Sequence, residues 1–458
     1  MRAALKRFQI AICLLVLISL VACSSGQTYK FKYESSTDLQ NSLQTAPDYP
    51  ETSFAVISDL HIYDLYLGTE GQAFEYYLDS DRKLLRESNQ IMAEAVSEIE
   101  KEGAKFVLIP GDMTKDGERS SHELAVTYLR QLEDGEKQVY VVPGNHDINN
   151  GHSAKFIGNA TERVPNITPA EFVDMYGDFG YKEALYRDTA SLSYVAEPQP
   201  GLWLLALDGC RYAENLANEA PVTDGKLSPA TLTWTEEILG KAASENKPVI
   251  VMIHHGVVEH YKGQEKNFGE YLLDDYPEVS KLFATYNARL VFTGHYHAQD
   301  ITEVRWQNPD KFVFDIETGS LVTYPTPYRV VTINGSQKAA VETKYVESIP
   351  SHQDDFQEYS RSYVLSGIQG IATNTIMGYK VNRVEAEKLA GQVAQAFVAH
   401  YAGDEVLAVG QEPLQSSGLS LPGWIVVNFR KNLVIGLWHD LPPSDNDVTI
   451  DLRTGVWR

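Results

Sequence analysis

The nine residues VYVVPGNHD at positions 139–147 place a run of β-forming side chains directly before a short polar turn. The run Val139–Val142 predicts a buried strand, because it is short, apolar and rich in β-branched residues. The turn then carries Asn145, His146 and Asp147, which supply an amide, an imidazole and a carboxylate. A strand that ends in such side chains predicts a functional site at that end of a sheet.

The same arrangement recurs along the chain, which has five polar clusters, four of them directly after an apolar run. The clusters are Asp59-Leu60-His61, Gly111-Asp112, Gly144-Asn145-His146-Asp147, His254-His255 and Gly294-His295-Tyr296-His297. Amphipathic helices lie between several runs, and the clearest has apolar residues at helical spacing from Leu84 to Ile99. Alternating strands and helices predict an α/β protein. Because ligands gather beyond the carboxyl ends of strands in such sheets, we expect the five clusters to converge on one site.

The side chains of these clusters are typical metal ligands. Carboxylate oxygens, an amide oxygen and imidazole nitrogens together suit divalent or trivalent Mn, Fe or Zn. The candidates are too many for one ion, and they are enough for two ions that share a bridging carboxylate. The sequence therefore predicts two metal ions, and it leaves their identity open.

The order of the clusters (D-x-H, G-D, G-N-H-D, H and G-H-x-H after apolar runs) resembles the signature of the calcineurin-like metallophosphoesterases over residues 54–297. The resemblance implies a four-layer αββα sandwich, in which two packed mixed sheets lie between helical layers. It implies Asp59, His61 and His297 as ligands of a first metal, Asn145, His254 and His295 as ligands of a second, and Asp112 as the bridge. His146 would bind no metal; it would stabilise charge on the phosphoryl oxygens or protonate the leaving oxygen.

The chemistry that this resemblance implies is hydrolysis of a phosphate ester. Two cations about 3.5–4 Å apart lower the pKa of a water that they share, so that hydroxide forms near neutral pH. They also neutralise the phosphoryl oxygens, and the hydroxide can then attack an anionic ester without a covalent enzyme intermediate. The sequence has no motif for a Ser, Cys or His nucleophile.

Within this family the sequence is most similar to bacterial class III cyclic-nucleotide phosphodiesterase-like proteins. The similarity rests on Gly117-Glu118 followed by Ser121-His122, on the run HHGVVEH at residues 254–260, and on a helical C-terminal extension. It implies a phosphodiesterase that acts on small substrates such as cyclic nucleotides.

The protein-phosphatase branch of the family has a different pattern after the bridging carboxylate. That branch has an acid three positions after the bridging Asp, followed by Arg-Gly, whereas this sequence has Lys115 there and Asp116 next. The difference argues against protein dephosphorylation. It also leaves the hydrogen-bond partner of His146 open.

Other polar and aromatic residues near the clusters are weaker candidates. His260, His122 and Asp147 are candidates for contact with the substrate or with the metal ligands, which need orienting partners. Tyr63 and Tyr66 follow the first cluster, and aromatic rings there can stack on a nucleobase.

The N-terminal residues are typical of an export signal. Residues 1–22 begin with basic side chains and continue as an apolar run that is short for a membrane span and typical of a signal peptide. The sequence Leu-Val-Ala before Cys23 resembles the bacterial lipoprotein box, which implies cleavage before Cys23 and lipid on its sulfur. We therefore expect an extracytoplasmic lipoprotein, anchored in the cell membrane or the outer membrane.

The remainder of the chain divides into three predicted segments. Residues 23–50 are polar without periodicity and predict a flexible tether. Residues 51–341 contain the clusters and form the predicted catalytic domain, and residues 342–458 form an accessory domain that we expect to be largely helical. Within it, the stretch Trp424–Trp438 is expected to be strand-like or buried.

The composition limits the partners. A formal charge of -23 repels nucleic-acid polymers, and we predict a small phosphate ester as the substrate and no protein partner. The motifs are equally compatible with a surface phosphomonoesterase or nucleotidase that scavenges phosphate. A surface binding protein that has lost catalysis is the third hypothesis; the complete set of candidate ligands argues against it.

Overall fold

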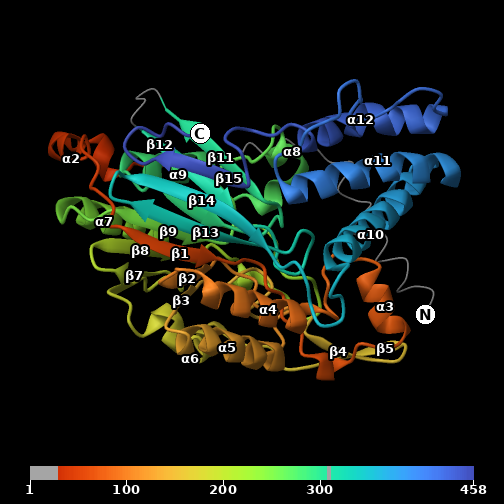
Figure 1. Cartoon of the computed structure of the whole chain (residues 1–458), viewed down its shortest axis with the longest axis horizontal. Coiled ribbons are helices and arrows are strands. Elements are labelled where there is room, and N and C mark those ends of the chain that lie inside the picture. Colours follow the sequence, from red (N-terminus) through yellow and green to blue (C-terminus); the bar gives the residue numbers. More distant parts are fainter. Residues whose placement is uncertain (1–28, 307–310) are drawn as a thin grey trace.

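The computed structural model describes residues 29–306 and 311–458, so Cys23 and the predicted signal peptide lie outside the described residues. Two mixed sheets pack face to face, and helices cover their outer sides (Figure 1). A small hairpin of β4 (Ala154–Ile157) and β5 (Ala160–Arg163) forms a third sheet.

The first sheet has six strands, and the three strands at one end of it are parallel. Its order is β15 (Asp447–Asp451), β14 (Lys338–Tyr345), β13 (Pro327–Asn334), β1 (Thr52–Val56), β2 (Phe106–Ile109) and β3 (Gln138–Val141). Strands β1, β2 and β3 run parallel, and β13, β14 and β15 continue the sheet with antiparallel pairings. The carboxyl ends of β1, β2 and β3 therefore lie at one edge.

The second sheet has seven strands and is built in the same way. Its order is β11 (Asp300–Arg305), β12 (Phe312–Glu317), β10 (Leu290–Thr293), β9 (Val249–Ile253), β8 (Leu202–Leu207), β7 (Tyr194–Gln199) and β6 (Tyr186–Arg187). Strands β12, β10, β9 and β8 are parallel, and the outer pairings are antiparallel. Strands β8, β9, β10 and β12 are buried along their whole length, as expected for parallel strands covered on both faces.

The main core lies between the two sheets. The ring of Phe54 on β1 stacks on Phe106 of β2 with centroids 4.7 Å apart, and it meets Phe292 of β10 edge-on at 5.3 Å. A second apolar cluster joins alternate residues of β8 and β9, among them Leu205 and Val251, to the helices outside the second sheet. The four-layer αββα architecture expected from the sequence is confirmed.

The helices of the layers and their connections are as follows. The first sheet is covered by α4 (Ser88–Lys101), α5 (Arg119–Asp134) and α6 (Pro169–Met175), and the second by α7 (Pro229–Ser244) and α9 (Tyr276–Thr285) (Figure 1). Shorter elements are η1 (Lys32–Glu34), α2 (Thr37–Ser42), η2 (Leu65–Leu67), α3 (Gln72–Leu78), η3 (Gly177–Tyr181), η4 (Tyr212–Glu214), α8 (Gln264–Phe268) and η5 (Gly269–Tyr271).

The C-terminal region is helical, as expected, but it returns to the first sheet. It consists of α10 (Phe356–Gly378), α11 (Arg383–Ala402) and α12 (Leu421–Leu437), which project from one end of the sandwich (Figure 1). The predicted boundary at residue 342 falls inside β14, and β15 pairs with β14 after the three helices. Among the described residues, no helix is both long and apolar enough to cross a membrane.

The expectation of a strand-like or buried stretch at Trp424–Trp438 was wrong. These residues form most of α12, and its apolar side chains point to both faces, so the helical period of apolar and polar residues is hidden. Val426 and Val434 are buried, whereas Phe429 is 82% exposed.

The prediction of a flexible tether was also wrong for residues 29–50. Phe31, Tyr33 and Leu43 are buried in the apolar cluster outside the second sheet. The hydroxyl of Tyr49 donates to the carbonyls of Val249 (3.2 Å) and Asn287 (3.3 Å). Aromatic residues spaced within a polar stretch carry this docking, which a composition argument cannot detect.

Removing the Tyr49 hydroxyl should destabilise the fold measurably. Tyr49→Phe should lower the free energy of unfolding by about 1–2 kcal/mol, because two buried carbonyls lose their hydrogen-bond donor. Tyr66→Phe, at a side chain that is 99% exposed, is the matched control and should change nothing. Urea denaturation of both variants gives the answer, and equal stability would show that the N-terminal segment does not dock on the second sheet.

Candidate metal centre

The carboxyl ends of five strands from both sheets meet at one place. Asp59, Asp112 and Asn145 follow β1, β2 and β3 of the first sheet, and His254 and His295 follow β9 and β10 of the second. The clusters expected to converge from the sequence therefore do so, although they come from opposite sheets. All five side chains are buried.

The loops that carry these side chains have unusual backbone conformations. Five non-glycine residues have positive φ, namely Asp59 (51°), His61 (40°), Asp112 (53°), His295 (78°) and His297 (69°). Side chains disfavour this region, and such strain is typical of functional sites, where the surrounding structure maintains it. Glycine is required beside them: a Cβ on Gly144 would lie 2.1 Å from Oδ1 of Asp112, and one on Gly294 2.0 Å from Oγ of Ser58.

The predicted ligands form two groups. In each, one potential ligand atom per residue lies within 4.8 Å of the others; the groups are Asp59, His61 and His297, and Asp112, His254 and His295. Asn145 joins the second group, because its Oδ1 lies 3.1 Å from Nε2 of His254.

Asp112 lies between the two groups. Its Oδ2 is 3.6 Å from Nε2 of His61 and 3.5 Å from Nε2 of His254. His61 belongs to the first group and His254 to the second, so this one carboxylate is placed to contact a cation in either group.

The hydrogen bonds of the imidazoles direct their lone pairs into the site. Nδ1 of His254 lies 2.7 Å from the carbonyl of Pro110 and donates to it, so Nε2 carries the lone pair and faces Oδ1 of Asn145. In the same way Nδ1 of His61 donates to the carbonyl of Thr114 (3.2 Å), and its Nε2 lies 3.2 Å from Nε2 of His297. Such carbonyls fix the tautomer of metal-binding histidines.

In these contacts, nitrogen and oxygen atoms that carry lone pairs face one another, and a cation between them would remove the repulsion. Two lone-pair atoms about 3 Å apart repel unless a proton or a metal lies between them. Within the described part of the chain, the buried Oδ1 of Asp59 has no hydrogen-bond partner, and it lies 3.4 Å from Nε2 of His297. The donor set and this orphaned oxygen fit two metal ions.

The electrostatics agree with this fit. Burial lowers the pKa of His61, His295 and His297, which keeps these rings in the neutral form that binds metals. Burial alone would raise the pKa of Asp112, but His254, His146 and His61 hold it well below its usual value. Burial also opposes a charge on His254, yet the carboxylate of Asp112 raises the pKa of that ring to about 9, so a proton takes the Nε2 position near neutral pH unless a metal ion does. The site therefore favours positive charge next to Asp112.

His146 is not part of either group of ligands. Its side chain is 24% exposed, and its Nδ1 lies 2.9 Å from Oδ1 of Asp116. The other oxygen of Asp116 accepts from Nζ of Lys115 (2.5 Å) and from the hydroxyl of Tyr77 (3.2 Å). Asp116 is thus the partner of His146 that the sequence left open, and a buried lysine holds the carboxylate in place.

Asp147 and His122 support the loops and do not face the open side of the site. The carboxylate of Asp147 accepts hydrogen bonds from the backbone nitrogens of Met113, Thr114 and Gly144. His122 is buried and contacts the carbonyl of Asp147 through Nε2 at 2.9 Å. Both residues connect the loop after β2 to the loop after β3.

His260 lies in a separate buried cluster. Its Nδ1 is 2.7 Å from Oδ1 of Asp300, and its Nε2 is 3.3 Å from Oδ2 of Asp315. Oδ2 of Asp315 accepts from the backbone nitrogen of Val257 at 2.6 Å, so the cluster holds the loop after His254-His255. The ring is fully buried among carboxylates, so His260 is not exposed to a substrate, and its contacts support the loop that carries His254.

The aromatic residues near the metal ligands are not those expected from the sequence. Tyr63 is buried and stacks on Phe74, and Tyr66 is almost fully exposed. The ring of Tyr271 instead lies 4.7 Å from that of His295. Tyr271 is the last residue of η5, between β9 and β10, and no local pattern in the sequence connects it to the clusters.

Two basic residues beside the site were also missed. Lys83 is buried, pairs with Asp81 at 3.3 Å, and lowers the pKa of His61. Its neighbour Arg82 opposes the rise that burial causes in the pKa of Tyr271, and its buried Nε has no hydrogen-bond partner among the described residues. They follow α3 in a loop without a recognisable motif.

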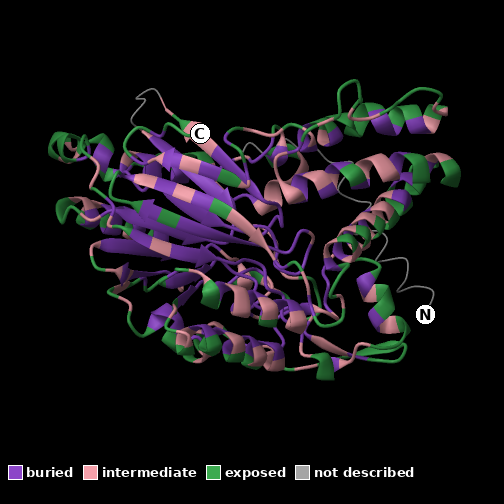
Figure 2. Ribbon diagram, in the orientation of Figure 1, coloured by how far each residue is buried: buried purple, intermediate pink, exposed green. Residues whose placement is uncertain are grey.

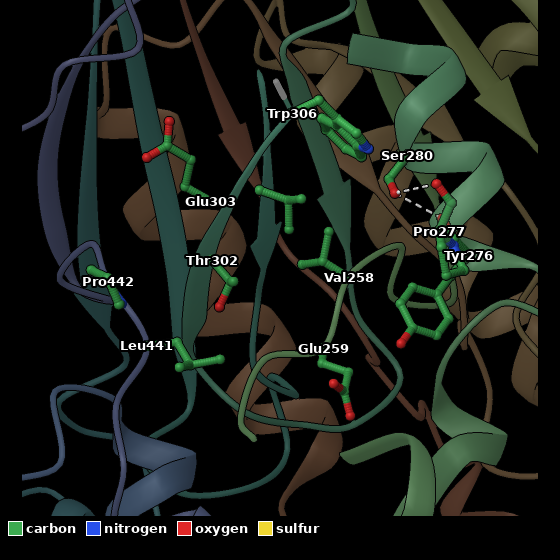
Figure 3. A pocket seen from close by; sticks show the side chains of 11 residues that line it. Val258, Glu259, Tyr276, Pro277, Ser280, Thr302, Glu303, Trp306, Leu441 and Pro442 are labelled. Carbon is green, nitrogen blue, oxygen red and sulfur yellow. Dashed lines mark hydrogen bonds between the residues drawn. The ribbon is translucent and has the colours of Figure 1, made fainter. Parts of the chain in front are cut away.

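A surface pocket away from this centre contains none of the predicted site residues (Figure 3). It has a volume of about 370 Å³ and is lined by residues that include Trp306, Tyr276, Glu259 and Glu303. Its carboxylates disfavour a phosphate ester.

Solved structures with similar folds include several phosphatases. A dimetal phosphatase from Danio rerio has 15% sequence identity and a TM-score of 0.46, with 65% of this chain and 97% of that chain covered. A putative 5'-nucleotidase from Staphylococcus aureus has 14% identity and a TM-score of 0.40, with 68% and 58% covered. A purple acid phosphatase from yellow lupin (Lupinus luteus) seeds has 11% identity and a TM-score of 0.41, with 66% and 52% covered. No curated protein matches the chain.

A family model provides the stronger comparison. The model for calcineurin-like phosphoesterases matches residues 52–299, which is more than half of the chain. The matched range begins at β1 and ends just after His297, so it contains both groups of ligands. The chain belongs to the calcineurin-like phosphoesterase family.

Proposed function

We propose that this protein is a phosphodiesterase that hydrolyses small phosphate esters, cyclic nucleotides among them, at a dinuclear metal centre. The observation that supports this most strongly is the position of Asp112, whose Oδ2 lies about equally far from a histidine of each ligand group, at 3.6 Å and 3.5 Å. Asp59, His61 and His297 would hold one ion, Asn145, His254 and His295 the other, and Asp112 both. Bound there, Mn, Fe or Zn ions would supply Lewis acidity and a water of lowered pKa.

The remaining step, protonation of the leaving oxygen, is assigned to His146. Asp116 accepts from Nδ1, so Nε2 is the nitrogen that carries or receives the transferred proton. The backbone nitrogen of His146 donates to Oδ1 of Asp112 at 2.9 Å, which fixes the ring relative to the bridging carboxylate. Its partial exposure, unlike the buried ligands, leaves the ring accessible to an ester.

A phosphomonoesterase or nucleotidase is the second candidate, and Lys83 and Arg82 favour it. A monoester carries up to two negative charges on its phosphoryl group, one more than a diester. Lys83 acts electrostatically on His146 and His297 from a buried position, so its ammonium lies close enough to offset an added charge.

The catalytic assignment of His146 has a matched control in the chain. His146→Ala should lower turnover about 100- to 10,000-fold, the range for loss of a proton-transfer group, with metal content unchanged. His352 has a similar side-chain exposure (23% against 24%) and also contacts a carboxylate through Nδ1, so His352→Ala should leave turnover intact. Loss of one metal equivalent in His146→Ala would make His146 a ligand and refute its catalytic role.

Substrate preference distinguishes the two candidate functions. The Mn-loaded enzyme should hydrolyse a cyclic nucleotide and an aryl diester faster than an aryl monoester or a phosphopeptide. A monoester preferred by about tenfold or more would contradict the diesterase proposal. In that case Lys83→Met should reduce monoester turnover more than diester turnover, because the extra charge loses its counter-ion.

We also propose that the protein is exported and anchored through lipid on Cys23. The box ending at Cys23 supports this, and two or more acyl chains bind a membrane stably. Cys23→Ser should release the protein from the membrane fraction. Mass spectrometry that finds Cys23 unmodified, or cleavage elsewhere, would show a protein that is only secreted.

A further inference from the structure

Helix α12 carries a row of large apolar side chains on its outer face. Leu421 is 71% exposed, Trp424 54%, Ile425 41%, Phe429 82% and Ile435 45%. At about 100° per residue these positions fall within an arc of about 140°. Val426, Val427, Val434 and Leu437 on the opposite side are buried, and α12 packs mainly on α11. Helix α12 therefore has apolar side chains on two sides and exposes one of them (Figure 2).

An exposed apolar surface of this kind typically marks an interaction site. Charge indicates which kind of partner it fits. The chain has 62 acidic residues, yet residues 413–439 contain none. Of the two exposed basic residues of α12, Lys431 borders the apolar face and Arg430 lies on the opposite side of the helix. Glu385 of α11 lies at the start of α12, where its Oε1 accepts from the backbone nitrogen of Ser420. The apolar face therefore belongs to a local basic region of a strongly acidic protein.

We propose that α12 binds the surface of an anionic lipid bilayer, with the face of Leu421, Trp424, Ile425, Phe429 and Ile435 inserted among the headgroups. Trp and Phe are favoured at this depth, and Arg and Lys are attracted to anionic headgroups. The helix has 17 residues with two charges in its centre, which suits a helix lying in the interface better than a span of about 20 apolar residues. A symmetric pairing of two copies through this face would bring Lys431, at its edge, close to its own counterpart, which like charges disfavour.

The helix is held firmly against the catalytic domain. A Cβ on Gly436 would lie 2.9 Å from the ring of Tyr261, and the hydroxyl of Tyr261 lies 3.4 Å from that of Tyr296. Tyr296 stands between the metal-site residues His295 and His297. A bilayer bound to α12 would therefore fix the orientation of the metal centre relative to the membrane, independently of any lipid on Cys23.

The test uses the full chain with Cys23→Ser, so that no attached lipid contributes. The chain has six tryptophans, and Trp424 is one of them. Vesicles of phosphatidylglycerol and brominated phosphatidylcholine should quench the tryptophan fluorescence of the protein. The Trp424→Phe variant should lose most of this quenching. Ile425→Glu with Phe429→Glu should weaken partitioning to these vesicles at least about tenfold. The matched control combines Tyr66→Glu with Leu216→Glu, at side chains that are 99% and 58% exposed. This variant should bind the vesicles as well as the parent chain does.

The possible outcomes separate the occupants of this face. Quenching that depends on Trp424, on the anionic lipid and on the two apolar residues supports the proposal. Equal partitioning of the two double variants, or no quenching of Trp424, would overturn it. Self-association that Phe429→Glu abolishes, without vesicle binding, would assign the face to a second copy of the chain. Phosphoesterase activity of each variant in solution shows that the fold is intact, and none of these residues touches the metal centre.

Discussion

The carboxylate of Asp112 is the contact that joins the two sheets at their functional edge. It is 1% exposed, and burying an ionised carboxylate costs several kcal/mol unless opposite charge compensates it. Compensation comes from His254 of the second sheet, whose pKa the carboxylate raises to about 9, and the neutral ring of His61 from the first sheet lies 3.6 Å from the same oxygen. The left-handed backbone at Asp59 and Asp112, and the close approach at Gly144, follow from bringing these groups together in so little space. Two bound cations would complete the neutralisation that His254 begins.

Much of this centre could be predicted because its chemistry lies where strands end. Each predicted ligand lies at most four positions after an apolar run or belongs to a two-histidine motif. The local sequence alone therefore places it at the edge of a sheet. The partner of His146 could not be identified in this way. Asp116 and Lys115 are adjacent in sequence, and both are buried. Only the structure shows that one oxygen of Asp116 contacts His146 and that the other accepts from Lys115.

Other features escaped prediction because they depend on contacts between distant segments. Tyr271 and Lys83 reach the ligands from loops far away in sequence, whereas Tyr63, close to His61, packs into a separate core with Phe74. Residues 29–50 have the composition of a linker, yet Tyr49 is anchored to backbone carbonyls of the second sheet. In α12 the apolar residues on both faces hid the helical period, and the same property leaves the exposed face that we assign to a bilayer.

Electron paramagnetic resonance of the Mn²⁺-loaded protein can show whether two ions share the carboxylate of Asp112. We expect two manganese ions per chain with a spin-coupled signal, because a single carboxylate would bridge them. Asp112→Asn should lose the coupled signal, whereas Asp59→Asn should retain one uncoupled ion at the second group. A single bound ion in the wild-type protein, or two ions without magnetic coupling, would contradict the bridging role of Asp112.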